Sequence, residues 1–197
     1  MQNPLTEQEI IARLHRSHQT ASSDGYAEIP ISAETQLKSA AVLVPLFLQA
    51  NQWHLLYTRR TDSVESHRGQ VSFPGGACDP NDETFEQTAL REAQEEIGLL
   101  PEDVQLVGQL RTLITITNFR ITPVVSIIPW PYTFRISTEE VGRVFSMPLS
   151  WLSDPINRWE FTIPGRGNSV IYFQPYDGEL LWGATARMTV DLLNVFE

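Results

Sequence analysis

Apolar residues recur along this chain at two spacings, one typical of amphipathic helices and one typical of strands. Near the N-terminus, Thr6 and Glu9 have the spacing of a capping box, and an apolar helical face follows them. A similar box, Thr84 and Gln87, opens a second segment, which Gly98 would end. The segments expected to be helical are 7–18, 84–97 and 180–196.

Apolar runs of strand length lie between these helical segments. In chain order they are 39–49, 53–60, 70–73, 104–116, 121–129, 158–163 and 169–174. The first two are close enough to form a hairpin, and PGRGN between the last two is a strong hairpin signal. We expect residues 21–36 to be a connector and residues 137–152 to mix a short helix, a strand and a helix start. Strands interleaved with a few helices favour an α+β fold with a central mixed sheet, covered on both sides.

Length and composition narrow the class of protein. The 197 residues, 42% of them hydrophobic, suit one globular domain over 1–197, with 1–20 as an N-terminal helical extension. That helix would either cap the sheet or make a homodimer contact. No apolar run is long enough for a membrane span, the first 20 residues lack a signal-like core, and Cys78 has no disulfide partner. We therefore expect a cytoplasmic protein with no membrane partner.

Charge excludes one class of partner and makes one segment unusual. The formal net charge of −10 argues against binding to duplex nucleic acid, which needs clustered Lys and Arg. Yet LREAQEEIGL places three glutamates on one short helix: Glu92 and Glu96 lie one turn apart beside its apolar stripe, and Glu95 lies a little further round. Like charges one turn apart oppose helix formation, and partial burial increases the repulsion. The segment is either an ordinary solvated face or a site for a hard cation such as Mg²⁺, which prefers oxygen ligands.

The residues before and within this helix decide between the two interpretations. Residues 76–99 resemble the Nudix box, G-x5-E-x7-R-E-U-x-E-E-x-G-U with U apolar. Every specified position from Arg91 to Leu99 matches, and seven residues separate Glu83 from Arg91. Six residues instead of five separate Gly76 from Glu83, so the loop is one residue longer.

The resemblance implies a Nudix-like α/β/α sandwich and roles for individual residues. Glu92, Glu95 and Glu96 would hold Mg²⁺ or Mn²⁺, and Gly76 would give the loop its tight geometry. Glu83 and Arg91 would form a supporting pair. The raised charge density predicts raised carboxylate pKa values when no metal is bound. The catalytic set by resemblance is Glu83, Arg91, Glu95 and Glu96.

The segment from Leu56 to Gly76 resembles the additional signature of coenzyme A pyrophosphatases within the same superfamily. The matching positions, taken as substrate-binding, are Arg60, Thr61, Gly69, Phe73, Gly75 and Gly76, and Thr58 and Pro74 also match. Arg60 suits a phosphate, although a surface salt bridge is the alternative. Glu65 departs from the signature because it stands where an arginine is usual, and Arg68 would substitute for it.

The resemblance implies a metal-dependent hydrolase that cleaves the pyrophosphate of coenzyme A or its thioesters. The general base would be Glu95, Glu139 or Glu140. One alternative keeps the chemistry and changes the small-molecule substrate to ADP-ribose, NADH or a nucleoside triphosphate. Another is a catalytically silent Nudix domain that senses a ligand or binds a protein.

Overall fold

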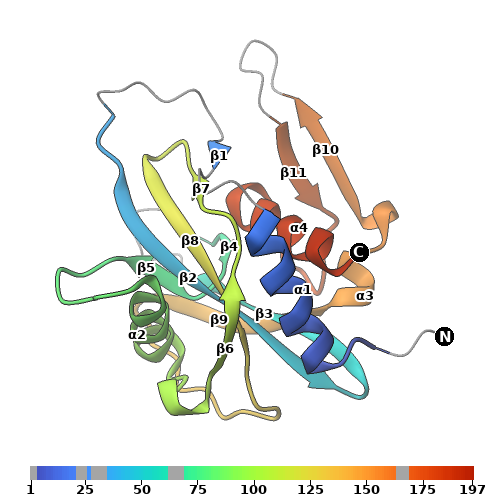
Figure 1. Cartoon of the computed structure of the whole chain (residues 1–197), viewed down its shortest axis with the longest axis horizontal. Coiled ribbons are helices and arrows are strands. Elements are labelled where there is room, and N and C mark those ends of the chain that lie inside the picture. The colour runs from blue at the N-terminus through green and yellow to red at the C-terminus, as the bar shows by residue number, and fades with distance from the viewer. Residues whose placement is uncertain (1–3, 21–25, 28–34, 62–68, 163–168) are drawn as a thin grey trace.

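We describe a computed structural model of the chain, in which residues 4–20, 26–27, 35–61, 69–162 and 169–197 are placed well enough to describe. A mixed sheet forms the centre, with helices on both of its faces (Figure 1). The helices are α1 (Glu7–Thr20), α2 (Phe85–Ile97), α3 (Leu149–Leu152) and α4 (Gly183–Phe196), with 3-10 turns at Pro101–Asp103 and Pro155–Asn157. Within the described ranges no helix has the length and apolar character needed to cross a bilayer. The predicted α+β class with a mixed central sheet is confirmed.

The central sheet runs in the order β1-β7-β8-β2-β3-β4, with β5 on β2, β6 on β8 and β9 on β3. Its strands are β1 (Tyr26–Ala27), β2 (Lys38–Gln49), β3 (Gln52–Arg60), β4 (Val71–Ser72), β5 (Gly75–Ala77), β6 (Gln105–Gln109), β7 (Leu113–Ile114), β8 (Phe119–Ile127) and β9 (Val141–Pro148). A separate antiparallel ribbon consists of β10 (Arg158–Thr162) and β11 (Ser169–Phe173). Both predicted hairpin pairs are therefore antiparallel neighbours.

Strand β2 explains why the sheet has two covered faces. Its residues 40–47 are all buried, as expected of a strand with helices above and below. Val42 and Val44 belong to the core that includes α1 and α4, whereas Ala41 and Leu43 belong to the core that includes α2. Each face of the strand thus contributes to a different apolar cluster.

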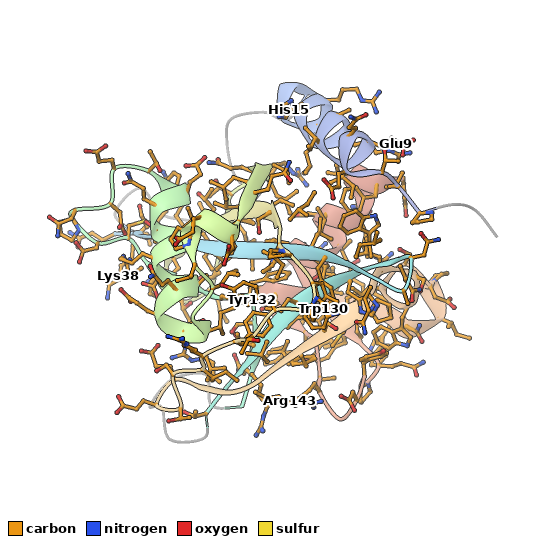
Figure 2. The ribbon with its side chains drawn as sticks, turned by 90° about the horizontal axis from the view of Figure 1, so that it is seen from below. Glu9, His15, Lys38, Trp130, Tyr132 and Arg143 are labelled. Carbon is orange, nitrogen blue, oxygen red and sulfur yellow. The ribbon has the colours of Figure 1, made fainter. Side chains whose placement is uncertain are left out.

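Helix α1 covers the sheet, as one of its two predicted roles requires. Ile10 and Leu14 are buried in the same core as α4. Arg13 donates a hydrogen bond to the Phe196 carbonyl, which ties the N-terminal helix to the C-terminal one. Seen from below, α1 with Glu9 lies at one edge of the molecule and Arg143 of β9 lies at the opposite edge (Figure 2).

Three local predictions were wrong. The segment 104–116 is not one strand, because it divides into β6 and β7, and the pairing of β6 with β8 shifts register between Leu106 and Gly108. The short helix expected from residue 137 is a turn over 138–140. Strand β5 was missed, because two glycines and an alanine carry no strand pattern.

Candidate metal and pyrophosphate site

The predicted caps fix where helix α2 begins and ends. The Gln87 N–H donates to the Thr84 hydroxyl at 3.2 Å, and the Gln87 side chain accepts from the Glu83 N–H at 2.6 Å. Gly98 takes the left-handed conformation with φ of +66°, and its N–H bonds back into the last turn. These caps set the rotation of the helix and so the direction of its carboxylates.

The three box glutamates do not share one environment. The side chain of Glu96 is 3% exposed and that of Glu92 is 16% exposed, whereas that of Glu95 is 60% exposed. Glu95 faces Arg91 instead, at 3.3 Å. Among the described residues no three carboxylate, histidine or cysteine side chains stand close enough to hold a metal ion. The structure therefore brings Glu92 and Glu96 to the buried side, and Glu95 would have to turn inward to join them.

The glycine loop runs directly against these carboxylates. A Cβ atom on Gly76 would lie 2.6 Å from the Glu92 carboxylate carbon and from both of its oxygens. Gly75 pairs with Val42 of β2, where a Cβ atom would lie 2.5 Å from the Ala41 carbonyl oxygen. Only glycine fits at Gly75, because a Cβ atom there would meet backbone atoms, whereas a side chain at Gly76 would displace the Glu92 carboxylate.

Burial and like charges disfavour ionisation at the floor of the site. Burial, together with the neighbouring charges of Glu92 and Glu140, raises the pKa of Glu96 to about 8 against the opposing effects of Arg60 and the Gly75 N–H. Burial also raises the pKa of Glu92, which Arg91 lowers in part. The predicted raised carboxylate pKa values are thus present. A cation placed between the two groups would remove the cost of ionising them.

Arg91 is held by a residue that the sequence analysis missed. Its guanidinium donates to both carboxylate oxygens of Asp82, at 3.2 and 2.9 Å, to Glu92 at 2.8 Å and to the Ala77 carbonyl at 3.2 Å. This pairing holds the pKa of Asp82 well below its usual range. The predicted Glu83–Arg91 pair is wrong, because the Glu83 side chain is exposed and Asp82 takes its place. One signal was available: five residues separate Gly76 from Asp82, the spacing that the box specifies.

The residues of the upstream signature lie in different surroundings. Arg60, the last residue of β3, places Nη1 3.8 Å from Oε1 of Glu96. Thr61 binds the turn before β9, where its N–H donates to the Glu140 carbonyl and its hydroxyl to the Glu139 carbonyl, both at 3.0 Å. The Phe73 side chain is 1% exposed and stacks on Tyr57 with ring centroids 4.8 Å apart.

The prediction that Phe73 contacts a ligand is therefore wrong for its side chain, which belongs to the core. Gly69 has a φ of +64°, a conformation that favours glycine, in the turn that leads into β4. Its binding to substrate stays a prediction. Glu65 and Arg68 lie outside the described residues.

The donor set suits a hard divalent ion. All the candidate ligands are carboxylate or backbone oxygens, which Mg²⁺ and Mn²⁺ accept. Within the described part of the chain, Oε2 of Glu96 is buried and has no hydrogen-bond partner. A buried carboxylate oxygen without a partner is costly, and a metal ion would satisfy it. The residues present therefore fit the ion that the box implies.

Comparisons with known proteins show the family. A family model described as the NUDIX domain matches residues 37–163. The uncharacterized Nudix hydrolase NudL of Yersinia enterocolitica is 38% identical over 161 residues, which make up 81% of this chain and 82% of that protein. Its counterpart in Salmonella paratyphi B is 39% identical over 156 residues, or 79% of this chain and 81% of that one.

A Nudix hydrolase structure from Alicyclobacillus acidocaldarius has the same fold, with a TM-score of 0.53 and 21% identity over 82% of this chain and 93% of its own. Nudix hydrolases in general use divalent ions such as Mg²⁺ or Mn²⁺. The chain belongs to the Nudix family, and it is a hydrolase that acts on pyrophosphate bonds of nucleotide derivatives.

Proposed function

We propose that this enzyme hydrolyses the pyrophosphate of coenzyme A or of its thioesters. The products would be 4′-phosphopantetheine, or its acyl form, and adenosine 3′,5′-bisphosphate. The observation that carries the proposal is the contact between two motifs. Arg60, from the coenzyme A-type signature, reaches the buried Glu96 of the Nudix box across 3.8 Å. A signature residue beside a candidate metal ligand would be able to reach the same pyrophosphate.

Glu92 and Glu96 would hold the ion from the floor of the site, with Glu95 joining them from the exposed side. Bound Mg²⁺ or Mn²⁺ would polarise the phosphoryl oxygens and lower the pKa of a water molecule. Arg91, which is fixed by Asp82, keeps the Glu92 carboxylate in place with a bond of 2.8 Å. Gly75 and Gly76 leave room for the diphosphate because they have no side chains.

We assign the general base to Glu140 in preference to Glu139 and Glu95. Glu140 lies close enough to the box for its charge to raise the pKa of both Glu92 and Glu96. Two bonds from Thr61 and one from the Ser137 N–H to the Glu96 carbonyl, at 2.9 Å, fix the turn that carries it. Glu140 itself is exposed, so it can accept a proton from water.

A substrate panel tests the substrate. Coenzyme A, acetyl-coenzyme A, ADP-ribose, NADH and a nucleoside triphosphate are compared by kcat/KM with Mg²⁺ and with Mn²⁺. We expect the two coenzyme A compounds to be cleaved best. A higher kcat/KM for ADP-ribose, NADH or the triphosphate would replace the proposed substrate while keeping the pyrophosphatase chemistry.

The same panel tests the base. Glu140→Gln should lower kcat by about 10²- to 10⁴-fold. Its KM should change little, because the metal ligands remain. Glu139→Gln is the matched control, since it lies one residue away on the same turn. Equal activity of Glu140→Gln and the wild type would remove the assignment.

A further inference from the structure

The ion pair between Arg60 and Glu96 is loose and incomplete on both sides. Its closest distance, 3.8 Å, is too long for a hydrogen bond. Three buried side-chain polar atoms without a hydrogen-bond partner occur in the described residues, and two of them are Nε of Arg60 and Oε2 of Glu96. Two unpartnered atoms on one ion pair indicate that each side chain is built for another ligand.

The surroundings show which ligands these would be. Oε2 of Glu96 lies at the floor of the carboxylate site, where a divalent ion satisfies it. Arg60 ends strand β3 and its side chain is 28% exposed, so its guanidinium can turn toward solvent. A planar guanidinium turned outward offers two donors to a phosphate.

Arg60 faces Oε1 of Glu96, and a divalent ion at the unpartnered Oε2 would lie close to that guanidinium. Two cations so close together would repel each other in a buried site. Without metal, Arg60 is the positively charged side chain that faces Glu96. Its distance of 3.8 Å leaves the carboxyl group accessible to another ligand.

We propose that Arg60 is an exchangeable partner of Glu96: it faces the Glu96 carboxyl group until the metal ion binds, and is then released toward the substrate diphosphate. Metal binding would thereby create the phosphate-binding arginine, so the two ligands bind in a coupled order. The metal half of this inference, the release of Arg60 when the ion binds, is independent of the substrate. The phosphate half, the binding of the released Arg60 to substrate, rests on the proposed function only because it requires a diphosphate.

The first experiment observes the release directly. The full chain is labelled with ¹⁵N, and the Arg60 side-chain signals are recorded without metal and with saturating Mg²⁺. The Arg60 signals are assigned as those that are absent from the spectrum of the Arg60→Lys variant. We expect the Arg60 signals to shift with Mg²⁺ alone, and the Arg59 signals to stay. An Arg60 signal that does not respond to Mg²⁺ would overturn the proposal.

The second experiment measures the competition. Mg²⁺ affinity is determined by calorimetry for the wild type and the variants at one common pH, with no substrate present. Arg60→Gln should bind Mg²⁺ about 3- to 10-fold more tightly than the wild type, since the competing charge is gone. Arg60→Lys should resemble the wild type, because it keeps the charge.

Arg59→Gln is the matched control for these variants. Arg59 precedes Arg60 on β3, has a similar exposure of 35% and pairs with Glu179 at the same distance of 3.8 Å. The Arg59→Gln substitution should leave the Mg²⁺ affinity unchanged. Weaker or equal Mg²⁺ binding by Arg60→Gln would mean a fixed ion pair and would refute the exchange.

Steady-state kinetics test the phosphate half of the proposal separately. For the substrate preferred in the panel, Arg60→Gln should raise KM about tenfold or more, and Arg60→Lys should raise it by less. An unchanged KM would refute the phosphate half. Failure of coenzyme A as a substrate would remove the proposed function and leave the Mg²⁺ results intact.

Discussion

Two buried glutamates face consecutive arginines of strand β3, and they differ in how fully they are paired. Among the described residues, Glu96 has one arginine partner, Arg60 at 3.8 Å, and one of its oxygens has no hydrogen-bond partner. Glu179, 10% exposed in its side chain, meets both Arg143 at 3.1 Å and Arg59 at 3.8 Å. Because successive side chains of a strand point to opposite faces, one sequence, Arg59-Arg60, serves both sites.

The difference separates a structural ion pair from a functional one. Arg143 also pairs with Asp177 and lies over the Phe145 ring, so in the Glu179 cluster two arginines balance two carboxylates. Hydrogen bonds to Asp177 and Glu179 also raise the pKa of Arg143. The Glu96 cluster has carboxylates in excess and a deficit of positive charge. The carboxylates of the Glu179 cluster are fully paired, and we call this the closed cluster. The Glu96 cluster is only partly paired, and we infer that this open cluster binds a ligand.

The largest expected effect is on activity at the open cluster. Glu96→Gln should lower kcat/KM by about 10²- to 10⁴-fold, because a metal ligand is lost. The same change should raise the melting temperature of the metal-free protein, since a neutral amide replaces a carboxylate whose ionisation burial disfavours. Thermal melts with and without Mg²⁺ check this. The wild type should gain stability from Mg²⁺, and Glu96→Gln should gain much less.

Glu179→Gln should give the reverse result at the closed cluster. It leaves two arginines facing a neutral amide, so we expect a loss of about 2–4 kcal/mol in the free energy of unfolding. Urea unfolding measures that loss, and kcat/KM below the melting transition should stay within about twofold of the wild type. If Glu179→Gln instead abolished activity in folded protein, the division between the two clusters would fail.

The pH dependence of stability should also distinguish them. Folding raises the pKa of Glu96 from 4.5 to about 8, so the folded state keeps a proton that the unfolded state has lost within this window. The contribution of Glu96 to stability is therefore greatest at low pH and declines as the pH rises from about 4.5 to about 8. Relative to Glu96→Gln, the metal-free wild type should lose about 1–3 kcal/mol between pH 5.5 and pH 8.5. Urea unfolding of both proteins at several pH values isolates this difference, and parallel curves would contradict it.

The helix and its caps could be predicted because they depend on local sequence. Thr84, Gln87 and Gly98 act on residues within one turn, and the structure confirms their roles. The burial of Glu96 beside Ala93 and Ile97 also follows from helical periodicity. A long, capped amphipathic segment leaves little freedom for another arrangement.

The rest depends on contacts between distant segments. That Glu140 approaches Glu92 requires the turn before β9 to be held by Thr61, 79 positions earlier in the chain than Glu140, through hydrogen bonds that no local pattern encodes. Phe73 was assigned to the ligand because it lies in a motif, but its side chain is directed into the core, where it packs on Tyr57. The direction of Glu95 depends on which carboxylates Arg91 binds.

The smallest expected effect concerns the support of Arg91, where neighbouring residues again differ. Asp82→Asn should cost about 1–3 kcal/mol in the free energy of unfolding, because it breaks a buried, doubly bonded ion pair. Since folding lowers the pKa of Asp82, its contribution is present above the unfolded value near 4 and is lost as the pH falls below it. Glu83→Gln, at the exposed neighbour, should change stability by no more than about 0.5 kcal/mol. Urea unfolding at pH 7 and at pH 3.5 separates the variants: the deficit of Asp82→Asn should shrink at the lower pH. If Glu83→Gln proved as costly as Asp82→Asn, Arg91 would have the partner that the box spacing first suggested, and the loop would have to shift by one residue in solution.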